Sequence, residues 1–261
     1  MNARARIPNF ASPLSVFLIF LLSALLPACA AEPTPPPPTL TPTATATVTP
    51  TIQWFPATNT PTAAVTIVPI PTLDLAADAG PLLFADDFSD DSVWTLASSA
   101  SGSAGIANNH LTLVARVSRT TLFSLRSQPY LTDFFLEVTA TPNLCRAGDE
   151  FGLLLRATPD FDYYRFGVSC DGRAHVDRIY RGAASAMQVW TAFPFLPSAP
   201  AVTRLAVWAD GSEIRLYANG QYLFTITDSL FYGGTLGLFV RAETETGMSV
   251  NFTDLSVYSL P

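Results

Sequence analysis

Short stretches of alternating hydrophobic and polar residues follow one another from residue 82 to the end of the chain. Gly, Asp, Asn and Pro residues interrupt these stretches about every 8–12 residues, as turns do in sandwich proteins. No window of about a dozen residues shows the 3.6-residue period of an amphipathic helix. The pattern predicts thirteen short strands, near residues 82–88, 93–97, 110–116, 121–126, 134–141, 151–158, 163–170, 175–180, 204–208, 213–218, 222–227, 236–241 and 249–259. This arrangement is typical of an all-β sandwich.

The clearest local signal is a double hairpin over residues 204–228. Asp210-Gly211 and Asn219-Gly220 are two-residue turn sequences, so each predicts a hairpin. The first turn pairs Val207 with Ile214 and puts the aliphatic side chains of both strands on the core face. The alternation then breaks before residue 226, which predicts a β-bulge in the third strand.

The other face of this double hairpin gathers aromatic and arginine side chains. They are Arg204, Trp208, Arg215, Tyr217 and Tyr222, with Tyr222 expected opposite Tyr217. Aromatic rings stack on the apolar faces of sugars, and guanidinium groups donate to hydroxyls or carboxylates. This face is therefore a candidate carbohydrate-binding platform, which Arg156 and either Tyr163 or Arg165 of the neighbouring hairpin would extend. The alternative is cross-strand pairing that only stabilises a half-exposed sheet.

Two cysteines flank another predicted hairpin. The strands near 151–158 and 163–170 are joined by a tight Pro159-Asp160-Phe161-Asp162 connection. In an antiparallel pair the end of the second strand lies beside the start of the first, so Cys145 and Cys170 meet at one sheet edge. An even pair of cysteines favours a disulfide bond if the domain lies in an oxidising compartment, which the N-terminal residues indicate below. Two separate, half-buried thiols are the alternative.

The N-terminal residues follow a different pattern. Arg4 and Arg6 precede a mostly apolar run, Leu14 to Leu26, that is too short to span a bilayer. With Leu26-Pro27-Ala28-Cys29, this segment resembles a bacterial lipoprotein signal peptide with its lipobox. The resemblance implies that residues 1–28 are removed and that the Cys29 thiol carries a lipid, which would anchor the protein at a membrane. An ordinary secretory signal with a chance cysteine is the alternative.

Pro, Thr, Ala and Val dominate the residues after this signal. Proline fixes φ and removes hydrogen-bond donors, so we expect an extended, disordered stalk over residues 29–80. Residues 81–261 are left to form one domain. We therefore expect an extracytoplasmic protein that is lipid-anchored to the bacterial cell membrane or outer surface. The net charge of −7 and the lack of any basic cluster argue against nucleic acid as a partner, and the oligomeric state stays open.

Several motifs resemble the concanavalin A-like lectin/glucanase family, which includes laminin-G-like and family-16 glycoside hydrolase-like domains. These motifs are Phe84-Ala85-Asp86-Asp87-Phe88-Ser89 with Trp94, Gly105-Ile106 through Leu113, Phe151 to Arg156 with Tyr163 to Phe166, Asp210 to Gly220, Gly234 to Leu238, and Val250 to Leu255. The resemblance implies an antiparallel two-sheet jelly-roll sandwich. It does not choose among hydrolases, lectins, binding modules and interaction domains.

No catalytic residue can be assigned. Family-16 hydrolases take their carboxylates from a Glu-x-Asp-x-x-Glu strand, which this chain lacks. Glu243-Thr244-Glu245 and Asp149-Glu150 are interpreted as loop charges. We expect binding of a carbohydrate or other surface ligand without catalysis. The alternatives are a glycoside hydrolase-like enzyme, of the 3-keto-disaccharide hydrolase-like kind, and an envelope protein-interaction or structural module.

An acidic cluster lies in the first predicted strand and its turn. Jelly rolls of this kind often bind Ca²⁺ near their first and last strands through oxygen ligands. Asp87 and Asp254 are the candidate ligands, with Asp86, Asp90 and Asp91 nearby. A structural Ca²⁺ is the cofactor that the resemblance suggests, and a solvated acidic turn is the alternative.

Overall fold

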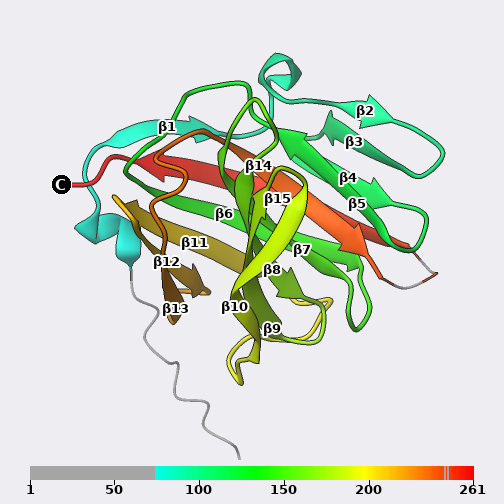
Figure 1. The fold of residues 1–261 in the computed structure, drawn as a ribbon. Helices are drawn as coiled ribbons and strands as arrows, with labels where there is room; N and C mark the ends of the chain where they lie inside the picture. Colours follow the sequence, from blue (N-terminus) through cyan, green and yellow to red (C-terminus); the bar gives the residue numbers. More distant parts are fainter. Residues whose placement is uncertain (1–73, 244, 246) are drawn as a thin grey trace, which may run out of the picture. The chain divides into compact units, whose positions relative to one another are not determined.

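Two antiparallel β-sheets pack face to face (Figure 1). The computed structural model describes residues 74–261 apart from 244 and 246, so the predicted signal peptide, Cys29 and the stalk up to residue 73 lie outside the described residues. The strands of the described part are β1 (Leu82–Asp86), β2 (Ala97–Ser98), β3 (Gly102–Ala107), β4 (His110–Ala115), β5 (Thr120–Leu125), β6 (Phe134–Leu144), β7 (Glu150–Ala157), β8 (Tyr163–Ser169), β9 (Arg173–Tyr180), β10 (Ala183–Ala192), β11 (Thr203–Asp210), β12 (Glu213–Ala218), β13 (Gln221–Thr227), β14 (Thr235–Ala242) and β15 (Met248–Tyr258). Two 3₁₀ turns, η1 (Leu75–Asp78) and η2 (Asp91–Val93), accompany them.

One sheet has nine strands and the other has six. The nine-stranded sheet runs β13-β12-β11-β6-β15-β4-β3-β2, and β1 also pairs with β15. The six-stranded sheet runs β10-β9-β8-β7-β14-β5. Alternate residues of both sheets point inward and form one buried apolar core between the layers. The predicted all-β, two-sheet jelly-roll class is confirmed. In the part of the chain described, no helix is long and apolar enough to cross a membrane.

The strand prediction missed three elements and misplaced one. β2, β3 and β10 were not predicted, and the strand expected near residues 93–97 is instead the turn η2 followed by extended chain. The first half of β10 is Ala183-Ala184-Ser185-Ala186, and alanine has little preference for strands. Pairing with residues 177–180 of β9 makes this half a strand.

The predicted double hairpin has the expected faces but a different first register. Ala209 pairs with Ile214, so the turn is Gly211-Ser212 and the pairing is two residues away from the predicted one. Gly211 has φ +53°, as the first central residue of a type II′ turn requires. Because a two-residue shift keeps every side chain on its face, the core face is as predicted. Tyr217 does lie opposite Tyr222, and the register slips next to this pair, which confirms the bulge.

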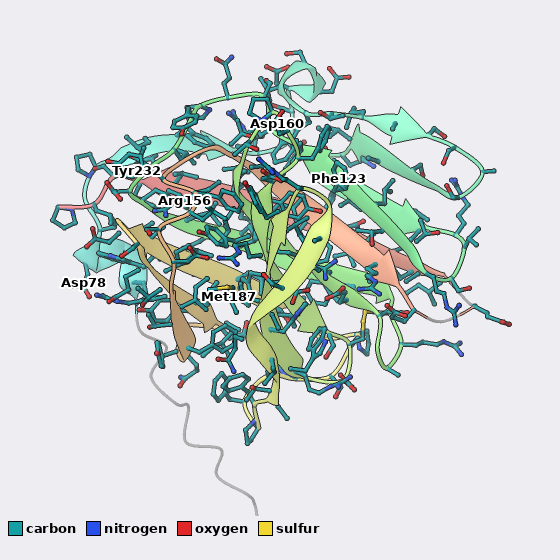
Figure 2. The ribbon with its side chains drawn as sticks, in the orientation of Figure 1. Asp78, Phe123, Arg156, Asp160, Met187 and Tyr232 are labelled. Carbon is teal, nitrogen blue, oxygen red and sulfur yellow. A yellow bond between two sulfur atoms is a disulfide. The ribbon has the colours of Figure 1, made fainter. Side chains whose placement is uncertain are left out.

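Arg156, labelled in Figure 2, is a fully buried arginine at the end of β7. Its guanidinium donates to the carbonyl oxygens of Phe231 (3.0 Å) and Thr132 (2.9 Å). It thereby ties the loops that precede β6 and β14 to the six-stranded sheet. Arg156, Tyr163 and Arg165 therefore belong to the sheet opposite β11 and β12. The expected extension of the aromatic platform by these residues is wrong, because the two hairpins lie in different layers.

The first described residues cover part of the nine-stranded sheet. Leu75 of η1 is buried against Phe135, Ala206 and Tyr217 on the outer face of that sheet. Residues 75–80 fall in the stretch that composition assigns to the stalk, yet they pack on the domain. The described chain therefore begins on the outer face of the nine-stranded sheet.

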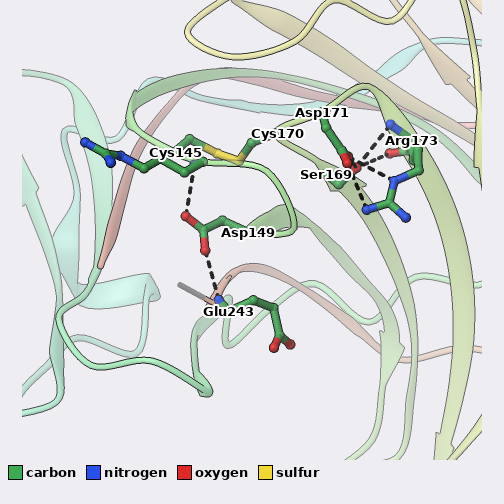
Figure 3. The surroundings of a disulfide bond; sticks show 8 residues. Cys145, Asp149, Ser169, Cys170, Asp171, Arg173 and Glu243 are labelled. Carbon is green, nitrogen blue, oxygen red and sulfur yellow. Dashed lines mark hydrogen bonds and ion pairs between the residues drawn. A yellow bond between two sulfur atoms is a disulfide. The ribbon is translucent and has the colours of Figure 1, made fainter. Parts of the chain in front are cut away.

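The disulfide between Cys145 and Cys170 is present, as predicted (Figure 3). The Cα atoms are 5.7 Å apart, and Glu150 pairs with Ser169 directly beside the bond. Asp149 supports the same corner, since its carboxylate accepts from the backbone N–H groups of Arg146 and Glu243, both at 2.9 Å. The bond thus links the segment that precedes β7 to the residue that follows β8.

Reduction of this bond, or the paired change Cys145→Ser and Cys170→Ser, should lower the free energy of unfolding by about 3.5 kcal/mol, because it releases a 25-residue loop in the unfolded chain. Urea unfolding with and without reductant measures the loss. The double variant is the control and should not respond to reductant. Equal stability of the oxidised and reduced protein would contradict the expectation.

Candidate functional site

Charged side chains from four strands meet on the outer face of the six-stranded sheet. They are Glu150 of β7, Arg165 of β8, His175 and Asp177 of β9, and Arg241 of β14. The residues that alternate with them in these strands point into the core, so the pleat turns the charged residues outward. The register brings them together: Arg241 lies opposite Glu150, and Arg165 lies opposite Asp177.

These groups form a continuous network. His175 Nε2 is 2.7 Å from a Glu150 carboxylate oxygen, and its Nδ1 is 3.6 Å from Asp177. Arg165 donates to Asp177 at 2.5 Å and lies 4.0 Å from Glu150. Arg241 lies 3.5 Å from the other oxygen of Glu150. Glu150 is 1% exposed and His175 is 4% exposed, so the centre of the network is shielded from water although it lies outside the core.

A glycine makes the Glu150–His175 contact possible. Gly167 of β8 lies between the two strands that carry them and pairs with His175. A Cβ atom at Gly167 would be 2.5 Å from His175 Nε2 and 2.6 Å from a Glu150 oxygen. The glutamate and the imidazole therefore meet across bare backbone, which only glycine provides.

Trp190 of the edge strand β10 lies flat on this network. Its ring is stacked on the His175 ring, with centroids 3.9 Å apart and planes 22° from parallel. Gln188 pairs with Val176 and Thr191 with Ala174, so two residues, Val189 and Trp190, face the single residue His175. This bulge aims the indole over the imidazole. Trp190 is still 37% exposed, and the Arg173 guanidinium lies 5.3 Å from its ring centre.

The network sets the charge of its members. Burial by itself would raise the pKa of Asp177, but hydrogen bonds from His175 and Arg165 outweigh it and lower the pKa to about 2. Burial would likewise lower the pKa of His175, yet the carboxylates of Asp177 and Glu150 outweigh it and raise the pKa above its usual 6.5. Each ring nitrogen of His175 faces a carboxylate, so the doubly protonated, cationic imidazole fits the site.

Sequence reasoning did not find this network. Glu150 was interpreted as a loop charge, but it begins β7 and is buried, because pairing with β8 and β14 extends the sheet to it. Asp149 does lie in the loop, although it too is buried. The spacing His175-x-Asp177 and the strand glycines Gly152 and Gly167 were the available signals, since glycine within a strand marks a close approach.

The predicted aromatic platform gathers on the outer face of the nine-stranded sheet. Trp208 packs on Phe135 with ring centroids 5.7 Å apart, and Tyr217 is nearly buried beside Leu75. Tyr222 remains 54% exposed. The two arginines are engaged by carboxylates: Arg215 with Glu213 at 2.5 Å, and Arg204 with Glu137 at 3.7 Å. The structure brings these five residues together, and their role as a ligand platform stays a prediction.

The acidic residues proposed for calcium hold local hydrogen bonds. Asp86 accepts from the Trp94 indole N–H (3.1 Å) and pairs with Arg126 (2.9 Å). Asp87 accepts from Ser89, and Asp254 accepts from Thr253. Among residues 74–261 apart from 244 and 246, no three His, Cys, Asp or Glu side chains gather as a metal site would need. The calcium site stays a prediction.

Two open clefts adjoin one another at one end of the sandwich. Their volumes are about 480 and 340 Å³, and both are lined by Arg126 and Tyr130. Arg126 gives its Nε to Asp86 and one Nη to the Gln128 carbonyl, and its guanidinium stacks on Phe84 at 4.3 Å. The Arg126 guanidinium is therefore already bound by groups of the protein itself. The outer face of the six-stranded sheet carries more of the chemistry that could recognise a polar ligand.

No protein-family model and no curated protein matches the sequence. Among solved structures, the chain is similar to the carbohydrate-binding module CBM66 from Bacillus subtilis (21% identity, TM-score 0.51, covering 64% of this chain and 96% of that one). It is also similar to a Bacillus subtilis protein of unknown function with a galectin-like fold (14% identity, TM-score 0.54, covering 69% of this chain and 97% of that one). A third similar structure is a Bacillus licheniformis β-glucanase (12% identity, TM-score 0.53, covering 70% of this chain and 99% of that one). The domain has the jelly-roll fold of carbohydrate-binding modules and β-glucanases.

The change Gly167→Ala should lower the free energy of unfolding by roughly 1–3 kcal/mol, because the new methyl group would force the buried Glu150 and His175 side chains apart. Gly105→Ala in β3 is the matched control, since its Cβ would meet nothing within 4 Å. Thermal or urea unfolding of both variants measures the difference. Equal stability of the two would show that the contact across Gly167 is not tight.

Acidification should lower the free energy of unfolding, because Asp177 becomes protonated. The pKa of Asp177 is about 2 in the folded protein, against an ordinary value of 3.8. Its contribution to the free energy of unfolding is therefore present above pH 3.8 and is lost as the pH falls through about 2. The full contribution is roughly 2 kcal/mol. Urea unfolding at a series of pH values should show this loss, and Asp177→Asn should flatten the profile in that window. Profiles of equal slope would contradict the assignment.

Proposed function

We propose that this domain binds carbohydrate without catalysis, on the outer face of the six-stranded sheet, with Trp190 as the stacking residue. The observation that carries the proposal is the half-exposed indole held flat over His175 by the bulge in β10. A flat aromatic ring whose orientation is set before binding suits the apolar face of a sugar ring, because little conformational entropy is lost on contact.

The same face carries partly exposed polar groups that could bind sugar hydroxyls, and the Arg173 guanidinium lies 5.3 Å from the centre of the Trp190 ring. Arg173 and Arg241 are both partly exposed, and each is paired with a partly exposed carboxylate, Asp171 and Glu243 respectively. Such pairs present donors and acceptors together, as neutral sugars need, with little net charge. The fold shared with carbohydrate-binding modules supports the same proposal.

The carboxylates beneath Trp190 are poorly suited to glycoside hydrolysis. A general acid in such enzymes has a raised pKa, whereas Asp177 is held ionised with a pKa of about 2. Glu150 is enclosed by His175, Arg165 and Arg241 and is almost inaccessible to water. Both groups are engaged in holding the surface, which favours recognition over bond cleavage.

We propose further that the protein presents this face from a membrane anchor. The lipobox-like sequence that ends at Cys29 and the Pro- and Thr-rich residues after it support this part of the proposal. The segment Leu75–Asp78 packs on the outer face of the nine-stranded sheet, which is the opposite side of the sandwich. A domain held from that side would direct Trp190 away from its attachment.

Binding to a panel of soluble β-glucans, xylan, mannan, pectin and mucin tests the function. For the polysaccharide that binds, Trp190→Ala should weaken affinity about tenfold or more, because the exposed ring on which the sugar would stack is lost from the centre of the contact. Trp208→Ala, on the opposite sheet, is the matched control and should change it little. Affinity would be measured by titration calorimetry.

Other outcomes would favour a different binding site or a different function. Loss of affinity in Trp208→Ala alone would favour the aromatic face around Tyr222. Release of reducing sugar from any polysaccharide of the panel would favour the glycoside hydrolase-like alternative. Absence of binding to every polysaccharide would favour a protein-interaction or structural module.

A further inference from the structure

His175 lies in an unusual position for a histidine of a β-sandwich. It is buried, yet it points away from the core and is covered by the Trp190 indole. Its two ring nitrogens face Glu150 and Asp177, so the imidazole has a carboxylate at each end and an aromatic ring on one face. Every one of these contacts is strongest when the ring is a cation.

The charges around His175 balance only when it is protonated. Glu150 of β7 and Asp177 of β9 face the ring directly, and Glu243 pairs with Arg241 at 2.5 Å. The cations that face this group are Arg165 of β8 and Arg241 of β14. Glu243 and Arg241 are partly exposed, whereas Glu150, Asp177 and Arg165 are largely shielded from water. A protonated His175 balances these three shielded charges, and a neutral one leaves a negative charge that only Arg241, shared with Glu243, can offset. Arg173 of β9 lies over Trp190 and is already paired with Asp171.

We infer that His175 is a positioning residue for Trp190: its cation holds the indole flat on the sheet, and loss of its proton releases the indole. The consequence for sugar binding rests on the function proposed above. A neutral imidazole keeps only one N–H, so one of its two nitrogens would turn a lone pair toward a carboxylate. The ring would then lose a hydrogen bond and its cation–π attraction to the indole together.

The predicted behaviour has a defined direction. The pKa of His175 is raised above 6.5. The indole of Trp190 should therefore be held fully in place below pH 6.5 and released as the pH rises through the pKa that His175 has in the folded protein. Sugar binding at Trp190 should therefore weaken about fivefold on going from about pH 6 to about pH 9, as expected for loss of a partly buried cation–π contact.

The test begins without any sugar. Acrylamide quenching of tryptophan fluorescence is measured against pH in the full chain, and the signal of Trp190→Phe is subtracted to isolate Trp190 from the other three tryptophans. NMR of the ring C–H groups follows His175 in the same samples, since the chain has only two histidines. Quenching of Trp190 should rise with the same midpoint as the titration of His175.

Two variants separate positioning from general stability. His175→Gln cannot carry a charge, so its Trp190 should be quenched equally at all pH values, at the level that wild type shows at high pH. His110→Gln removes the histidine of β4, in the opposite sheet, and should leave the wild-type profile unchanged. Should His175→Gln fail to fold, the wild-type titrations decide the matter alone.

Pairs of outcomes distinguish this inference from the proposed function. Matching midpoints for Trp190 quenching and His175 titration support the positioning role, even where no polysaccharide binds and the proposed function fails. Quenching of Trp190 that does not change with pH, or a His175 that is neutral at about pH 6, overturns the inference. Sugar binding that depends on Trp190, together with Trp190 quenching that does not change with pH, keeps the proposed function and overturns the inference.

Discussion

The burial of charged groups outside the apolar core is the constraint on which the binding face depends. Glu150, Arg165 and His175 are buried on the outer face of the six-stranded sheet, and Asp177 beside them is half-buried. A buried charge is tolerable only when it is paired and hydrogen-bonded, so each of these groups requires the others. Since they come from three different strands, the network also specifies how β7, β8 and β9 are aligned. A one-residue register slip in any of them would move its charged residues to the core face.

Two departures from regular strand structure make the network possible. Gly167 removes a side chain where Glu150 and His175 must meet, and the extra residue in β10 turns Trp190 over the imidazole. Each weakens the local strand, because glycine has no side chain to pack and a bulge interrupts the hydrogen-bond ladder. Both features lie at the point of the surface where Glu150, His175 and Trp190 meet.

The two outer faces of the sandwich are used differently. On the nine-stranded sheet, Leu75 and the residues after it cover Phe135, Ala206 and part of Tyr217 with apolar contacts. On the six-stranded sheet, the outer face is polar beneath and aromatic above, with Trp190 open to solvent on one side. The first face is thus partly occupied by the chain itself. The second keeps its aromatic ring available for a ligand.

The sequence alone determined what local rules govern. Period-two alternation predicted the sandwich. The turn residues Gly211 and Asn219-Gly220 predicted two hairpins, and the structure has both with the predicted core faces. The disulfide was also predictable, because Cys145 and Cys170 lie at the same end of one hairpin. Tertiary structure decided the binding face. Alternation says which residues share a face of one strand, but not which strands lie side by side, so the meeting of Glu150, His175 and Trp190 could not be foreseen. The pairing of the first half of β10 with β9 depends on the assembled sheet, because Ala183 to Ala186 have little preference for a strand.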